Sequence, residues 1–506
     1  MKYRILFLTI LPLLIMSCSR ENNRGSSSLS STSNPSSENI DVSFVALNDL
    51  HGVVDPRNNK EVGITKVATY LKDKKAQGSL LLNSGDMYQG TFIAGYDYGE
   101  TISKVMKDID FDSYTIGNHE FDWGIDLIKQ NEVTLGKKFL GANIYTYPEK
   151  KKATDLGESY IIKTINEGTP NEVKVGIIGA IGEDQITSIT STYVTNYTFV
   201  DPAPIIKDIS KDLKDNQGCN IVVADIHASI EQINANEISK YVDAVFLAHT
   251  HRETYDEINN VPFIQGGRYS EAVAELTLTY NKTNKSVKNK SHNIQKLAKL
   301  NLKEDESAKQ IIDAQRVITD PIGNRKLGTS SNYLSTGDMS CFYSKIAYEK
   351  AVDLGYNVDF VLFNPARYSL EPGEIKYSSL FETNPFDNDL YILSTNGYTI
   401  YREAITFGRQ MGYNPKGIDL NSISQQKSTW YEVLVYDYNG FHIGLDESGN
   451  KYYDYFAASF TGVEKHSPIH LEGVEVLNLT VSRLEKNPTI ISSDFSGNNF
   501  INQGLY

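Results

Sequence analysis

The sequence predicts an α/β layered domain followed by a second, α+β domain. Three observations support this prediction: short apolar runs of strand length, amphipathic stretches between several of these runs, and a break in helical pattern at residues 320–323. Strand-like segments that alternate with helix-like segments are typical of a parallel sheet covered by helices, in which ligands gather beyond the strand ends.

The predicted strands of the first domain are short apolar runs that end abruptly in polar residues. They occupy residues 42–47, 79–82, 174–178, 221–224 and 244–247. Between them, residues 63–75 and 205–213 carry apolar side chains at helical spacing. This alternation predicts an ordered domain that begins near Val42.

The second domain follows a charged, helix-like segment. We assign residues 41–300 to the first domain, 301–328 to a linker helix and 329–506 to the second domain. The second domain opens with a helix-like run at 339–354, and an apolar run at 358–363 follows it.

The N-terminus has the pattern of an exported protein. Lys2 and Arg4 precede an apolar run at 5–16, which is shorter than the ~20 residues that cross a bilayer. The ending Ile15-Met16-Ser17-Cys18 resembles a bacterial lipobox. We therefore expect a signal peptide at 1–17, a lipid on Cys18 and a flexible, Ser- and Asn-rich tether at 18–40. The protein would be lipid-anchored to the bacterial cell envelope, periplasmic or at the outer surface.

Composition excludes several classes of protein. The chain of 506 residues has 49 basic and 63 acidic side chains, a net charge of −14, which disfavours binding of a nucleic-acid polymer. Its three cysteines are isolated, so no zinc ribbon or redox pair is expected. Cys219 and Cys341 could form a disulfide in an oxidising compartment, and two buried free thiols are the simpler expectation.

Candidate metal ligands follow the predicted strands of the first domain. They are Asp49, His51, Asp86, Asn118, His227, His249 and His251, with His119 beside them. Asp49 and His51 alternate along the chain and should project to one side of an extended segment. Each piece alone is most often a surface turn or a satisfied polar residue. Together, carboxylate, amide and imidazole groups suit Zn²⁺, Mn²⁺ or Fe²⁺, and two such ions bridged by a carboxylate could activate water against a phosphoryl group.

These motifs resemble a known family. The order Asp49-Leu50-His51, Gly85-Asp86, Gly117-Asn118-His119-Glu120, His227 and His249-Thr250-His251 resembles the calcineurin-like metallophosphoesterase signature. The longer motifs at 48–52, 85–90 and 117–122 resemble, more narrowly, the 5′-nucleotidase family, which includes 2′,3′-cyclic phosphodiesterases. The resemblance covers residues 42–272 and implies a four-layer sandwich with two divalent ions (Mn, Zn or Fe).

The resemblance also implies a role for each residue. One metal would be held by Asp49, His51, Asp86 and His251. The second would be held by Asp86, Asn118, His227 and His249. His119 would contact the scissile phosphate, oriented by Asp122. Ala248 stands where the family generally has glycine, and we expect the site to tolerate the added methyl group.

The second domain resembles the family's C-terminal substrate-binding domain less closely. Segments 363–367, 371–375 and 384–389 follow the family order, but Pro365 and Ala366 replace glycines. No Gly-Gly-Asp loop occurs in the last hundred residues, so a two-ring clamp for a purine is in doubt. The candidate substrate-binding residues are Asn364, Arg367, Arg402, Arg409 and Phe495. For Arg402 and Arg409, a surface ion pair is an equally good explanation.

We therefore expect a metal-dependent hydrolase of small phosphate esters, a 5′-nucleotidase-like phosphatase that acts on nucleotides. The alternatives are a cyclic phosphodiesterase or pyrophosphatase with a non-purine substrate, and a surface-exposed binding lipoprotein with a residual metal site. A binding module would not need His119 beside the ligands. The sequence predicts no oligomeric state.

Overall fold

The structure, a computed structural model, describes residues 38–386, 388–406, 411–445, 451–454 and 467–502. The expected signal peptide, Cys18 and nearly all of the expected tether lie outside these residues, as does Arg409. The first strand, β1 (Asn39–Leu47), begins before Val42, because backbone pairing with Asn281 and Tyr280 extends it into polar sequence.

The first domain contains two large sheets and a two-stranded one formed by β4 (Ile144–Thr146) and β7 (Tyr197–Phe199). The first has the order β13 (Ser286–Lys296), β12 (Ala272–Asn281), β1, β2 (Leu80–Asn83), β3 (Ser113–Tyr114). The second has the order β10 (Glu253–Ile258), β11 (Val261–Gly266), β9 (Ala244–Leu247), β8 (Ile221–His227), β6 (Val173–Ile181), β5 (Tyr160–Ile165). Strands β1, β2 and β3 run parallel, as do β6, β8 and β9. Their carboxyl ends therefore lie at one edge of each sheet.

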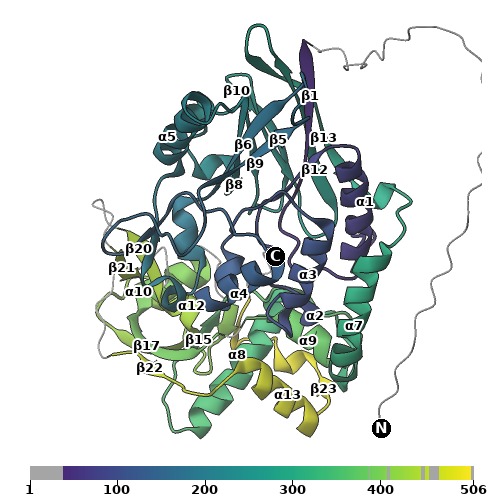
Figure 1. Cartoon of the computed structure of the whole chain (residues 1–506). Helices are drawn as coiled ribbons and strands as arrows, with labels where there is room; N and C mark the ends of the chain where they lie inside the picture. Colours follow the sequence, from purple (N-terminus) through teal and green to yellow (C-terminus); the bar gives the residue numbers. More distant parts are fainter. Residues whose placement is uncertain (1–37, 387, 407–410, 446–450, 455–466, 503–506) are drawn as a thin grey trace, which may run out of the picture. The chain divides into compact units, whose positions relative to one another are not determined.

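Helices cover the outer face of each sheet and complete four layers. Phe44 of β1 packs between the sheets against Phe246 of β9, with ring centroids 5.7 Å apart, whereas Val45 packs with the helices. The first sheet shares its outer core with α1 (Ile64–Ala76), α3 (Glu100–Ile109) and α4 (Ile125–Leu135). The second sheet is covered by α5 (Pro202–Asp215) and α6 (Ala235–Ile238). Figure 1 shows α1 and α5 on opposite sides of the paired sheets, so the predicted four-layer sandwich is confirmed.

The second domain is built around a six-stranded sheet. Its order is β22 (Ile469–His470), β17 (Leu390–Asn396), β19 (Trp430–Tyr436), β15 (Phe360–Phe363), β18 (Met411–Tyr413), β24 (Phe500–Ile501). The helices α8 (Thr336–Asp353) and α13 (Val476–Lys486) share its main core. A three-stranded sheet joins β16 (Gly373–Lys376), β14 (Lys326–Ser330) and β23 (Thr489–Ile490).

The helix α7 (Glu306–Gly323) precedes the second domain. It runs through Pro321, where the sequence predicts a break in the helical pattern. Pro321 stands in the last turn, so the helix loses one backbone hydrogen bond near its end rather than in its middle.

Two further findings concern the cysteines and the lengths and hydropathy of the helices. Cys219 and Cys341 are both buried and free, which confirms the simpler expectation of two thiols. In the part of the chain that the structure describes, no helix has the length and apolar character to span a membrane.

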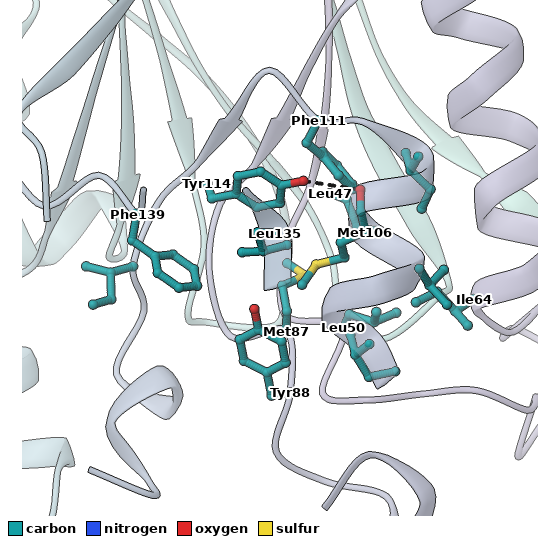
Figure 2. Packing of buried hydrophobic residues seen from close by; sticks show 14 of the residues in the cluster. Leu47, Leu50, Ile64, Met87, Tyr88, Met106, Phe111, Tyr114, Leu135 and Phe139 are labelled. Carbon is teal, nitrogen blue, oxygen red and sulfur yellow. Dashed lines mark hydrogen bonds between the residues drawn. The ribbon is translucent and has the colours of Figure 1, made fainter. Parts of the chain in front are cut away.

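The first-domain core anchors the loops that carry the candidate ligands. Leu50, between Asp49 and His51, and Met87, next to Asp86, are both fully buried. Figure 2 shows both side chains in this core, near Met106. The loops therefore have apolar side chains pointing into the core and polar ones pointing away from it.

Replacing Phe246 with alanine should destabilise the first domain. The ring is fully buried between the sheets, and Phe→Ala in a core costs ~3–5 kcal/mol. Urea unfolding followed by tryptophan fluorescence measures the loss. The control Val133→Ala, at a position 80% exposed on α4, should change stability by less than ~0.5 kcal/mol. Equal stability of the two variants would contradict a packed interface between the sheets.

Candidate metal centre

Two groups of possible metal ligands lie at the carboxyl ends of the parallel strands. One consists of Asp49, His51 and His251, and the other of Asp86, His227 and His249, with the ligand atoms of each group within 4.8 Å of one another. Asn118 joins the second group, because its Oδ1 lies 3.2 Å from His227 Nε2 and 3.1 Å from His249 Nδ1. The structure thus brings together all seven ligands expected from the sequence.

Asp86 lies between the two groups. Its Oδ2 is 3.1 Å from His227 Nε2 and 4.0 Å from His51 Nε2. A single carboxylate therefore faces donors of both groups, the arrangement needed for a bridging ligand.

The loops reach this geometry through left-handed backbone. Asp49, His51, Asp86, His249 and His251 have φ of 48°, 50°, 57°, 74° and 60°. The side chains of Asp49 and His51 converge, but the extended segment expected from their spacing is wrong, because β1 ends at Leu47. Non-glycine residues in this region are uncommon and strained, and they cluster at functional sites. Ala248, in place of the family's glycine, is fully buried and has no left-handed φ.

Backbone carbonyls set the tautomers of two histidines. Nδ1 of His51 donates to the carbonyl of Gln89 at 3.0 Å, and Nδ1 of His227 donates to the carbonyl of Ser84 at 2.8 Å. A carbonyl can only accept, so Nε2 of each neutral ring carries the lone pair and faces the site.

The donor set fits divalent ions. Nε2 of His51 and Nε2 of His251 face each other at 3.0 Å, and burial lowers the pKa of His251 to about 2 and that of His249 to about 4. Burial alone would raise the pKa of Asp86, but His227 and His119 hold it well below its usual range. Burial opposes a charge on His227, but the carboxylates of Asp86 and Asp49 raise its pKa to about 10, so a metal ion would bind here by displacing the proton of His227. With that proton displaced, neutral imidazoles, an amide oxygen and an ionised carboxylate are ligands for Zn²⁺, Mn²⁺ or Fe²⁺.

Glu120 fixes the two ligand loops to each other. Its buried carboxylate accepts from the N–H groups of Asp86 (2.9 Å), Met87 (2.9 Å) and Gly117 (2.6 Å). Burial and the nearby Asp86 carboxylate raise the pKa of Glu120 to about 7. Glu120 was not among the site residues expected from the sequence, although a charged residue directly after two of them was a usable signal.

His119 and Asp122 form a pair beside the ligand groups. Nδ1 of His119 donates to Asp122 Oδ2 at 2.7 Å, which leaves Nε2 available to a bound molecule. Burial opposes a charge on the ring, but the carboxylates of Asp122 and Asp86 raise the pKa of His119 above its usual value. The ring of Phe386 stacks on His119, with centroids 5.9 Å apart and planes 24° apart.

A cavity of about 360 Å³ opens beside this pair. The first domain contributes Asn118, His119, Asp122 and His249 to its wall, and the second contributes residues that include Asn364, Arg367, Phe386 and Tyr438. The structure therefore brings the expected Asn364 and Arg367 to the same cavity as His119. Phe386 and Tyr438 were not among the expected substrate-binding residues.

Two other expected residues lie elsewhere. Phe495 is 7% exposed and belongs to the core of the second domain. Arg402 donates to the hydroxyl of Tyr398 at 3.1 Å and lines none of the described cavities. Phe495 stands in a polar segment and Arg402 in a largely apolar one, and neither segment contains a signal that distinguishes a core ring or a half-buried guanidinium from a substrate contact.

Comparison with known proteins gives a match to one family model and a similar fold. A family model described as calcineurin-like phosphoesterase matches residues 42–253. The endonuclease YhcR of Bacillus subtilis is 26% identical over 476 residues, which cover 86% of this chain and 38% of that protein. A snake venom 5′-nucleotidase of Gloydius brevicauda is 24% identical over 370 residues, covering 65% of this chain and 59% of that protein. The chain thus spans less than two thirds of the length of either relative.

The whole architecture is similar to a solved 5′-nucleotidase. The crystal structure of a 5′-nucleotidase precursor from Thermus thermophilus aligns with a TM-score of 0.69 at 17% identity, covering 89% of this chain and 97% of that one. At this identity the likeness concerns the fold, and it extends over both domains.

Replacing Asp86 with asparagine should weaken both metal sites, because the change withdraws the charge that the two groups share. Elemental analysis after reconstitution should find two ions per wild-type chain and fewer in Asp86→Asn. The control Asp243→Asn alters a carboxylate that accepts from Val222 N–H outside the centre and should keep both ions. One ion or none in the wild type, or two in Asp86→Asn, would contradict the shared position.

Proposed function

We propose that the whole chain hydrolyses small phosphate esters, with nucleotides as substrates, because residues 42–253 match the family model described as calcineurin-like phosphoesterase. The observation that carries this proposal is the position of Asp86 Oδ2 between His51 and His227. The His119–Asp122 pair opens onto the same cavity as Arg367, which is the arrangement a phosphate ester requires.

The seven ligands would hold two divalent ions. When bound, these ions supply a Lewis acid and a water of lowered pKa. The ligand set contains no thiolate within the described residues, which leaves Mn²⁺, Zn²⁺ and Fe²⁺ as candidates.

Side chains of the two domains orient the substrate and stabilise the charge that develops on its phosphate. Arg367 binds the phosphate oxygens, since a guanidinium matches two oxygens at once. His119, held by Asp122 through Nδ1, points Nε2 toward the phosphate and stabilises charge that develops there. Phe386 covers one face of the His119 ring and keeps water from it.

Export and lipid anchoring on Cys18 belong to this proposal and rest on the sequence alone. The domain limits 41–300, 301–328 and 329–506 also belong to it. Sheet composition supports the first-domain limits, because the two large first-domain sheets use strands from Asn39 to Lys296, whereas the second-domain sheets begin with β14 at Lys326, before the proposed limit of 329.

Replacing His119 with asparagine should lower kcat by ~10²–10⁴ while two ions stay bound, as expected for loss of a positioned acid or electrostatic group. Steady-state kinetics and elemental analysis of the same sample measure both quantities. The control His470→Asn removes a second histidine that faces an aspartate, Asp389, at 3.4 Å and should keep kcat. Loss of metal together with activity in His119→Asn would make His119 a ligand or a structural residue.

The substrate panel should show modest base selectivity. Base stacking on aromatic rings is worth ~1–3 kcal/mol per base, but the cavity's Phe386 stacks on His119, and Tyr436 stacks on Phe363 at 3.9 Å. With phosphate and sugar contacts dominant, kcat/KM for AMP, CMP and ribose 5-phosphate should agree within about tenfold, or ~1.4 kcal/mol.

This panel also tests the function itself. Turnover of none of the three esters with Mn²⁺, Zn²⁺ or Fe²⁺ would refute phosphate-ester hydrolysis. A purine preference of about a thousandfold, or ~4 kcal/mol, would refute only the weak base selectivity. Such a preference would mean that other aromatic rings hold the purine base, such as those of Phe456 and Phe460, which lie outside the described residues.

A further inference from the structure

Arg367 is held by few polar contacts. Its Nε and Nη2 are buried without a hydrogen-bond partner among the described residues. The aromatic ring of Tyr368 lies beside it, with the centroid 5.9 Å from Arg367 Cζ, at the limit of the ~6 Å range of a cation–π contact. Tyr368 is therefore a main restraint on the guanidinium.

Two cavities meet at Arg367. It lines the 360 Å³ cavity with His119 and also a second cavity of about 560 Å³ with Arg57, Tyr269 and Tyr368. Arg367 thus borders a cavity on each side, and among the described residues no hydrogen bond of Nε or Nη2 fixes the direction of its guanidinium. A specific contact is needed to keep it at the phosphate.

Arg57, from the first domain, packs against the ring of Tyr368, which lies beside Arg367. Its Cζ lies 4.3 Å from the ring centroid of Tyr368 and 4.4 Å from that of Tyr269. Its Nε and Nη2 donate to the two oxygens of Glu61 at 3.1 and 3.0 Å, and the Glu61 side chain is only 2% exposed. This bidentate pair fixes the plane of the Arg57 guanidinium.

Tyr269 packs against Arg57 and also contacts the loop that carries the expected metal ligands Asp49 and His51. Its N–H donates to the carbonyl of Asp49 at 2.6 Å, and its ring lies 5.8 Å from that of His51. The rings of Tyr269 and Tyr368 also touch, with centroids 6.1 Å apart. The loop that carries Asp49 and His51 is thus connected to the loop that carries Arg367 by continuous packing through Arg57 and the two tyrosine rings.

We propose that Arg57 is a positioning residue, which holds Arg367 at the substrate phosphate through the ring of Tyr368. The inference rests on the proposed function for the role of Arg367 and extends it. Arg57, a first-domain side chain that does not touch the substrate, then sets the affinity of Arg367 in the second domain for the phosphate. Arg57 contributes to binding of the phosphate and not to the chemical step.

Calorimetric titration of the metal-loaded full chain with inorganic phosphate tests this directly, together with KM and kcat for AMP. Arg57→Ala should weaken phosphate binding and raise KM by about tenfold, the size of one lost cation–π restraint. Its kcat and metal content should stay as in the wild type. Arg57→Lys keeps the charge beside Tyr368 and should recover part of the affinity.

A double-mutant cycle separates positioning from general destabilisation. If Arg57 acts through Arg367, Arg57→Ala should have no further effect on phosphate affinity in an Arg367→Ala background. Tyr368→Leu should reproduce the loss of Arg57→Ala while leaving the Arg57–Glu61 pair intact, so the test survives if Arg57→Ala fails to fold. The control Arg316→Ala breaks an exposed pair with Asp55, near Arg57 in the sequence, and should keep wild-type KM.

The outcomes distinguish the two claims. A wild-type chain that neither binds phosphate nor hydrolyses AMP refutes the proposed function and this inference with it. A wild-type chain that does both, with Arg57→Ala and Tyr368→Leu unchanged in phosphate affinity, refutes the inference alone. Equal losses with and without Arg367 would also refute it, because they would mean a structural role for Arg57.

Discussion

The rest of the site depends on one buried carboxylate, that of Asp86. A carboxylate removed from water needs compensating charge and hydrogen bonds. Asp86 receives them from the imidazoles of His227 and His51 at 3.1 and 4.0 Å, and from the N–H of His119 at 2.8 Å. Its left-handed backbone, with φ of 57°, is retained because Glu120 binds the N–H groups of Asp86 and Met87.

The ligands could be found in the sequence because parallel strands bring their carboxyl ends to one edge. Asp86, His227 and His249 follow β2, β8 and β9 closely or end them, so strand prediction placed each of them at the carboxyl edge of its sheet. Because β2 belongs to one sheet and β8 and β9 to the other, the resemblance of the motifs to a known family was needed to group them at one site. The backbone conformation that makes these side chains converge could not be predicted from the strands. Left-handed backbone at five ligands and the three N–H groups on Glu120 depend on contacts between loops that are distant in sequence, which no local pattern encodes.

The second domain was harder to predict for a related reason. Its strands and helices follow from apolar patterning, but which side chains reach the first domain depends on how the loops fold over it. Arg367 reaches the cavity, whereas Phe495 packs into the core. The contact of Arg57 with Tyr269 and Tyr368 joins three segments far apart in the chain. Its members are unremarkable in sequence, and their packing connects the loop of Asp49 and His51 with the loop of Arg367.

A carboxylate of Asp86 that is shared between two metal ions can be seen by anomalous X-ray diffraction from crystals grown with Zn²⁺. Two anomalous peaks per chain are expected, one beside Asp49, His51 and His251 and the other beside Asn118, His227 and His249. Both peaks should lie about 2.0–2.2 Å from an oxygen of Asp86, the usual zinc–carboxylate distance. A single peak, or two peaks of which only one touches Asp86, would show that the carboxylate is not shared.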